Sequence, residues 1–534
     1  MSAPGRTLVL AGLAASVGLP LLLVLVPMLR DTLTHDDAAS GLLLSGGMLR
    51  ALWTSAQVGL LIALLATAMG WMLAGVLARG GARAGIMLLP ALVPAYLAYV
   101  GWGQLRAPGT WIGDWLLTQS SAGRHGLVAL AGRACAVLGL ALWASPIAGL
   151  VLAAGVRRRG RAFEESLALD SAPWHARTLE RLRFHRADAL GAAALVWVVM
   201  IGSAVPLHVA QVRTLSIELW LAMVATPPAE WGRLWAAAWP LAFAAAAAGW
   251  CLAGVAVRAG EREVGGDERA RTGAAWAAGA WTVWSLALAV PLALAAANIG
   301  GWSVFTRLWR LDAPALLHSL ARGTLVGGAL CLLACAASVL VSTGSRADRA
   351  AVRWALRAAI LLALLPGFAV GASLSRWGLG ESQAGPALAQ LARFAFVGLL
   401  AGVWACRGES FERRAARHLE SDAVLRPWAL GVLPEQWRVL AGVWLVGVAL
   451  SLSEIEATVF VEPPGAAGGS LAQKMLGHLH FARTEELNAT LLVLVTLGAV
   501  PCLLGGVWIM ATRTSSPAPP ATPPHPATDP NRDR

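Results

Sequence analysis

The sequence predicts an all-α integral membrane protein, on the strength of three observations. First, 57% of the 534 residues are hydrophobic and only 13% are charged, whereas soluble domains carry roughly 25% charged residues. Second, the mean hydropathy is +0.63. Third, apolar runs of about 20 residues, the length that crosses the hydrocarbon core of a bilayer, recur along the chain. A soluble enzyme is therefore excluded.

About twelve runs satisfy this length criterion. We expect the first of them to be a membrane helix and not a signal peptide, because its apolar stretch is too long. In chain order the runs are Thr7–Leu29, Ala51–Ala78, Ala84–Leu105, Ala134–Val156, Ala189–Val212, Leu234–Val257, Gly273–Ala297, Gly323–Ser345, Ala358–Ser375, Pro386–Cys406, Val439–Glu456 and Leu487–Thr512.

The positions of the basic residues predict the orientation of the chain. If the N-terminus is cytoplasmic, about two thirds of the 42 Lys and Arg residues fall on the cytoplasmic side, as the positive-inside rule requires. An even number of spans then places both termini in the cytoplasm. The net charge of +12 reflects this bias, so we expect membrane lipid as a partner and no nucleic acid. Residues 513–534 are rich in proline and predict a disordered tail.

The order of features suggests that the chain contains a parallel repeat. Residues 1–257 and 273–512 each carry six predicted spans, joined by a cytoplasmic linker at 258–272. The fourth span of each half leads into a long basic loop, at 157–188 and at 407–438, and each loop contains a Phe-Glu pair. Six spans per half keep both halves in one orientation, unlike the inverted repeats of many secondary transporters.

Two groups of residues are candidates for lining a transmembrane path. Prolines inside membrane helices are tolerated where a cavity or a neighbouring helix satisfies the freed carbonyls; Pro90 and Pro366 occupy corresponding helices, and Pro94 follows Pro90. Ionisable groups at membrane depth are functional candidates, which selects Glu454 and Glu456. The alternatives are ordinary kinked packing for the prolines and interfacial pairing with Lys474 or Arg483 for the carboxylates.

No enzymatic or metal chemistry is predicted. Lys474 is the chain's only lysine, and its surroundings lack the spacing and following hydroxyl of a phosphate-binding loop. Cys331 and Cys335 lie four apart on one predicted helix without a histidine or carboxylate, so we expect core packing and no metal site. The His-x-His at 478–480 predicts simple solvent exposure.

The two loops resemble the Glu-Ala-Ala motif of binding-protein-dependent ABC importer permeases. In the first loop Glu165-Ser166-Leu167 occupies the Glu-Ala-Ala positions, and Phe184 stands at the family's proline. In the second loop the glutamate position is Arg414. By this resemblance the ATPase-coupling residues are Glu164, Glu165, Asp170, Ser171, Ala415, Ala416, Glu420 and Pro434. For Glu164 and Glu165 the alternative is a solvated helix start.

The resemblance covers most of the chain and is most specific in the stretch SLSEIEATVFVEPPG, residues 451–465. This stretch, LLPALVP at 88–94 and LLPGFAVG at 364–371 are similar to segments of fused iron(III)-type permeases. The resemblance implies a type I permease without cofactor, which moves iron(III) across a bacterial plasma membrane. Two ATPase subunits would bind the ATP, and an extracytoplasmic binding protein would deliver the solute. Thiamine and phosphonate permeases share the pattern. A proton-coupled secondary transporter and an intramembrane enzyme are the alternatives of another class.

Overall fold

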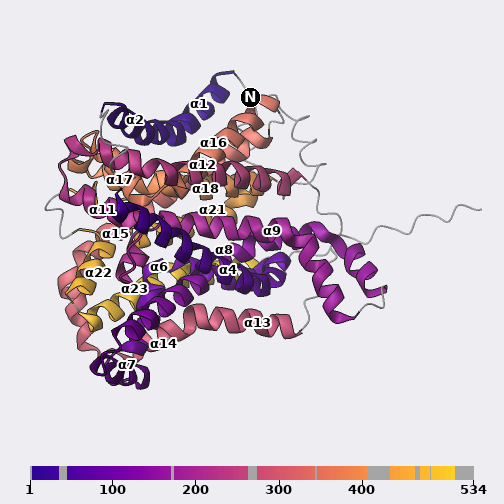
Figure 1. Ribbon diagram of the computed structural model, residues 1–534. Helices are drawn as coiled ribbons and strands as arrows, with labels where there is room; N and C mark the ends of the chain where they lie inside the picture. The colour runs from indigo at the N-terminus through magenta and orange to yellow at the C-terminus, as the bar shows by residue number, and fades with distance from the viewer. Residues whose placement is uncertain are drawn as a thin grey trace, which may run out of the picture.

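Figure 1 shows the computed structural model, which describes residues 3–34, 45–169, 173–261, 274–342, 345–406, 433–463, 469–481 and 483–511. All regular secondary structure in these residues is helical, as the composition predicts. The N-terminal elements are α1 (Ala3–Leu13), η1 (Ala14–Gly18), α2 (Leu19–Leu33), α4 (Gly46–Arg79), α5 (Gly81–Leu92), α6 (Ala95–Gly103), η2 (Gln104–Arg106), α7 (Trp111–Ser121), α8 (His125–Leu169), α9 (Trp174–Gly202), α10 (Val205–Val209), α11 (Leu215–Ala225), η3 (Pro228–Glu230) and α12 (Gly232–Glu261). The C-terminal elements are α13 (Ala274–Trp284), η4 (Ser285–Ala289), α14 (Val290–Ala297), α15 (Ser303–Ser342), α16 (Arg346–Leu364), α17 (Gly367–Ser375), η5 (Leu379–Glu381), α18 (Ala384–Ala405), α21 (Leu433–Ser453), α22 (Leu471–His480) and α23 (Thr484–Ala511).

Within the described residues, ten helices are long and apolar enough to cross a bilayer, as in a multi-pass integral membrane protein. They coincide with ten of the twelve predicted runs. The third and ninth predicted runs, Ala84–Leu105 and Ala358–Ser375, each contain a break. The third is divided into α5 and α6, and the ninth into α16 and α17, which are bent by 99°. Each division falls at a proline.

Small residues allow the longest helices to pack closely. A Cβ added to Gly70 of α4 would lie 2.8 Å from the backbone nitrogen of Gly149 in α8. A Cβ on Gly398 or Gly402 of α18 would strike the carbonyl oxygens of Leu330 and Ala334 in α15. Such backbone approach through glycine is the usual way that helices associate in lipid, where apolar side chains gain nothing from leaving the solvent.

The order of packing in the N-terminal elements resembles that in the C-terminal elements. In the first, α4 packs against α8 and α9; in the second, α15 packs against α18 and α21. The helices α12 and α23 extend across to the other part of the chain, because α12 packs on α16 and α23 packs on α5. Figure 1 shows α1 and α2 along one edge of the molecule and α13 and α14 along the opposite edge. Both pairs contain a five-residue π-helical turn, η1 and η4.

Candidate functional site

Two helix breaks with the same backbone geometry define the candidate site. At the first, Val93 has φ −80° and ψ 139°, and Pro94 has φ −53° and ψ 131°. At the second, Leu365 has φ −59° and ψ 145°, and Pro366 has φ −52° and ψ 131°. A proline removes one backbone donor and disfavours the helical conformation of the residue before it. Pro94, and not Pro90, is therefore the structural counterpart of Pro366; Pro90 lies inside α5.

A side chain from a neighbouring long helix satisfies the carbonyl that each break exposes. The indole Nε1 of Trp143 in α8 donates to the oxygen of Val93 at 2.7 Å. The Nη1 of Arg393 in α18 donates to the oxygen of Leu365 at 2.5 Å. A buried polar backbone group is stable only when it is hydrogen-bonded. Both breaks meet this requirement in the same way, through a donor side chain from a neighbouring long helix.

The turn that follows α21 brings the buried carboxylate of Glu454 to the second break. Its Oε1 accepts the backbone N–H of Ala457 at 2.8 Å, and its Oε2 lies 3.6 Å from Nε of Arg393. Glu454 is 8% exposed. Arg393 therefore joins the broken helix at Leu365 to the turn after α21.

Glu456 connects this turn to the N-terminal elements of the chain. Its Oε1 accepts the Ser203 hydroxyl at 3.1 Å and the backbone N–H groups of Ala204 and Val205 at 2.8 and 2.9 Å. A Cβ on Gly367 would lie 2.5 Å from Cβ of Glu456, so only glycine lets α17 approach this closely. The Pro366 break, the turn after α21 and the start of α10 thus meet at one buried position. We call residues Arg393, Glu454 and Glu456 the central junction.

The first break lies close to the same region. Tyr96, two residues after Pro94, is buried, and its hydroxyl donates to Sδ of Met475 in α22 at 3.6 Å. Glu454 and Glu456 are buried at the central junction. Pro90 borders an apolar pocket together with Val93, Trp143 and Pro291.

Two short helices beside the junction are held by matching serine contacts. The Oγ of Ser55 in α4 accepts the N–H of Leu215, the first residue of α11, at 2.8 Å. The Oγ of Ser319 in α15 accepts the N–H of Leu471, the first residue of α22, at 2.9 Å. Hydroxyl residues cap both short helices directly, Thr214 before α11 and Ser470 before α22. The free N–H groups at each helix start are thereby satisfied.

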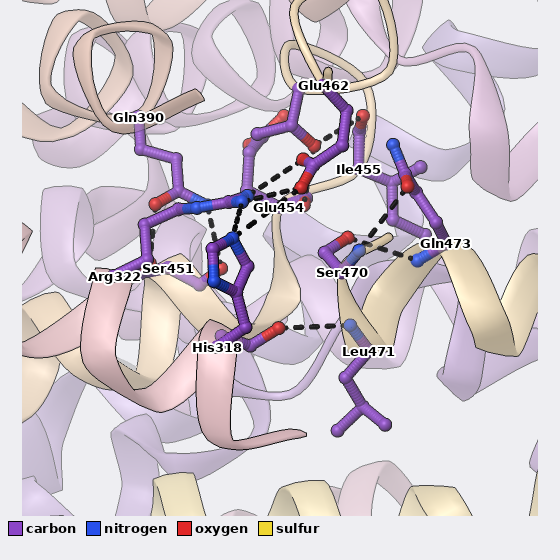
Figure 2. A network of polar contacts seen from close by, with 12 residues as sticks. His318, Arg322, Gln390, Ser451, Glu454, Ile455, Glu462, Ser470, Leu471 and Gln473 are labelled. Atoms are coloured by element: carbon purple, nitrogen blue, oxygen red, sulfur yellow. Dashed lines mark hydrogen bonds and ion pairs between the residues drawn. The ribbon is translucent and has the colours of Figure 1, made fainter. Parts of the chain in front are cut away.

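A second buried ion pair, between Arg322 and Glu462, was not predicted from the sequence. Figure 2 shows Arg322 of α15 facing Glu462, with two hydrogen bonds of 2.9 and 2.5 Å between guanidinium and carboxylate. Nε2 of His318 lies 2.7 Å from Nη2 of Arg322. The Arg322 and Glu462 side chains are 4% and 6% exposed. The partners are 140 residues apart in the sequence, so sequence spacing gives no signal for this pair.

Glu454 and Glu456 do not pair with the cations that the sequence offers nearby. These carboxylates contact Arg393 and the start of α10 instead of Lys474 or Arg483. Nζ of Lys474 lies 4.0 Å from Oδ1 of Asp312. Nε2 of His478 lies 3.0 Å from Oδ2 of the same carboxylate. His478 is buried, so the prediction of solvent exposure for this histidine is wrong. Its contact with the Asp312 carboxylate of α15 accounts for the burial.

The predicted coupling residues are described only in part. The backbone of α8 continues as helix through Glu164 and Glu165 to Leu169, and α9 begins at Trp174. Pro434 falls in the first turn of α21. The remaining predicted positions lie outside the described residues: Asp170, Ser171, Ala415, Ala416 and Glu420.

Comparison of the chain with protein-family models, curated proteins and solved structures finds no match.

Proposed function

We propose that the chain is the transmembrane permease subunit of an ABC importer, built from two duplicated halves, 1–257 and 273–512. The observation that carries the proposal is the pair of proline breaks with similar backbone angles. The exposed carbonyl at each break is satisfied by a donor from a neighbouring long helix. A break of this kind is expected where irregular backbone borders a transport path. Its recurrence in two parts of one chain is expected of a duplicated permease.

Other contacts support the duplication. The serine caps on α11 and α22 have the same donor, acceptor and helix position. The exchange of α12 and α23 is reciprocal, since each packs on the bent helix of the other part. Two halves that share their outer helices in this way can rotate against each other without separating, which is the motion that alternating access requires.

The helical segments on both sides of residue 170 are the proposed ATPase contact. Two large apolar side chains in this part of α9, Leu179 and Phe184, are 48% and 49% exposed. They lie on a basic helix, in which Arg183 forms an ion pair with Glu180 at 2.8 Å. The two apolar side chains are five residues apart and point to different sides of the helix, and we propose that each contacts the ATPase. The loops at 157–188 and 407–438 would each receive one ATPase subunit, which binds the ATP.

The central junction is the proposed gate of the path. Glu456 bonds the turn after α21 to the first half, while Arg393 and Glu454 tie the same turn to the Pro366 break. Rotation of one half against the other has to separate Glu456 from α10, because these contacts bridge the two halves. We propose that these contacts hold the path closed.

The proposed substrate is iron(III), presented by an extracytoplasmic binding protein and moved inward across the plasma membrane with both termini of the chain in the cytoplasm. The support is the resemblance of residues 451–465 to iron(III)-type permeases, together with the two carboxylates that this stretch places at the junction. Carboxylate oxygens are the ligands that hard cations prefer.

Energy dependence of uptake tests this function. Cells that make or lack the chain are given labelled iron(III), after either depletion of ATP or collapse of the proton gradient. The proposal predicts chain-dependent uptake that stops when ATP is removed and persists when only the gradient is lost. Uptake that follows the gradient would indicate a secondary transporter and contradict the proposal. ATP-dependent uptake of another class of solute would support the permease assignment but contradict iron(III) as the substrate.

A further inference from the structure

A row of arginines follows one face of α16. Arg346, Arg349, Arg353 and Arg357 are spaced by three or four residues, so they lie on one side of the helix. The first three are exposed and Arg357 is partly exposed, whereas Val352 and the rest of the opposite face are buried. We call these four residues the α16 arginine stripe. Among the described residues, no carboxylate forms an ion pair with Arg353 or Arg357.

Two tryptophans hold the last member of the stripe. The Arg357 guanidinium carbon lies 3.8 Å from the ring centroid of Trp250 in α12 and 4.8 Å from that of Trp354. The two rings are 5.3 Å apart at 68°. These cation–π contacts hold the guanidinium group in place through the ring faces, so they do not use its N–H donors. Both indoles are more than half exposed, at 53% and 57%.

The surroundings place this site at the edge of the lipid. The exposed face of α12 runs from Phe243, which is 68% exposed, through Ala247 to Trp250. An exposed apolar face on a membrane-spanning helix faces hydrocarbon, and tryptophan concentrates where hydrocarbon meets the headgroups. The α16 arginine stripe begins where this apolar face ends. Its cations therefore lie at the depth of the lipid phosphates.

We propose that the α16 arginine stripe, with Trp250 and Trp354, is a binding site for the phosphate headgroup of an anionic phospholipid. Arg357, held beside the two indoles, donates paired hydrogen bonds to the phosphate oxygens. Arg353 adds a second cation one turn away. The acyl chains lie along the apolar face of α12, over Phe243. A zwitterionic headgroup cancels much of the charge attraction, so the site discriminates between lipid classes.

Native mass spectrometry of the full chain in detergent tests this assignment. Short-chain phosphatidylglycerol and phosphatidylcholine are titrated against the wild type and against Arg353→Ala, Arg357→Ala and Arg357→Lys. We expect tighter binding of phosphatidylglycerol to the wild type and about fivefold weaker binding for each arginine removed. Arg357→Lys keeps the charge but loses the flat paired donors, so its affinity falls between those of wild type and alanine. Arg233→Ala, exposed at the other end of α12, is the matched control and should change nothing.

Several outcomes would overturn the assignment. Equal binding of the two lipids to the wild type would show that the site does not recognise the charge of the headgroup. An equal loss of affinity in Arg233→Ala would show that the effect comes from the net charge of the protein and not from this site. Displacement by inorganic phosphate at the concentration at which phosphatidylglycerol binds would show a phosphate site with no lipid. Loss of a co-purified protein in Arg357→Ala with unchanged lipid selectivity would show a protein-docking surface instead.

Discussion

Buried charges in this chain are held by partners from distant parts of the sequence. Arg322 and Glu462 are 140 residues apart, and Arg393 reaches both Leu365 and Glu454. The sequence shows that Glu454, Glu456 and Arg393 are unusual at membrane depth, because ionisable groups there are rare. It does not show which groups meet, since that depends on how the helices cross. The nearby cation Lys474 suggested a local pairing, but the three-dimensional partners differ.

Removal of Arg322 should destabilise the protein strongly. Arg322→Met leaves the Glu462 carboxylate buried without its cation, which typically costs about 3–5 kcal/mol. The melting temperature in detergent should fall clearly. Arg310→Met, an exposed arginine on the same helix, should melt like wild type. Adding Glu462→Gln to Arg322→Met should recover part of the loss, and an unchanged melting temperature in the single variant would show that the pair contributes little.

At Glu456 we expect the acceptor oxygen to matter more for stability than the charge. Glu456→Gln retains an oxygen for Ser203, Ala204 and Val205, whereas Glu456→Ala leaves these donors without their acceptor. An unmet buried donor costs about 1–3 kcal/mol. Thermal unfolding should therefore rank wild type and Gln above Ala. If Gln and Ala are equally destabilised, the negative charge itself holds the junction.

At the level of helices, the apolar runs predict where the spans lie. They do not predict at which residue a span is divided. Ten runs form long helices, but Ala84–Leu105 and Ala358–Ser375 are divided. Proline alone does not decide this, because Pro146, Pro240 and Pro314 lie inside unbroken helices. Breaks occur where Trp143 or Arg393 supplies a donor for the freed carbonyl. Those donors come from other helices, so the run itself contains no signal for them.

The two breaks should respond to substitution unlike a proline inside a helix. Pro94→Ala and Pro366→Ala remove the restriction on the preceding residue, and the loss of proline's constraint on the unfolded chain costs about 1 kcal/mol. We expect both variants to reduce uptake while remaining in the membrane. Pro90→Ala, four residues before the first break, is the control and should transport normally. Equal uptake in all three variants would show that the two breaks are not required for transport.

At the scale of the whole molecule, the sequence predicts the fold class and the similar order of features in the two parts of the chain. The reciprocal packing of α12 and α23 was not predicted, because hydropathy gives no information on which spans are neighbours. The predicted coupling residues remain predictions. Asp170, Ser171 and the second loop lie outside the described residues, and Glu164 and Glu165 are placed only as part of the backbone of α8.

Purification of the tagged chain from its native membrane in mild detergent, with identification and quantification of every co-purifying protein, tests the central claim most directly. An ABC permease should bring with it an ATPase that carries a phosphate-binding loop, in a ratio of two copies to one chain. Glu165→Lys should reduce that ratio by about tenfold or more, as expected from the loss of a charge-assisted contact of about 1.5–3 kcal/mol. Glu230→Lys, at an exposed position outside both coupling loops, serves as the control for added charge. A chain that purifies intact and alone, and still mediates uptake in a membrane free of any ATPase, would contradict the account.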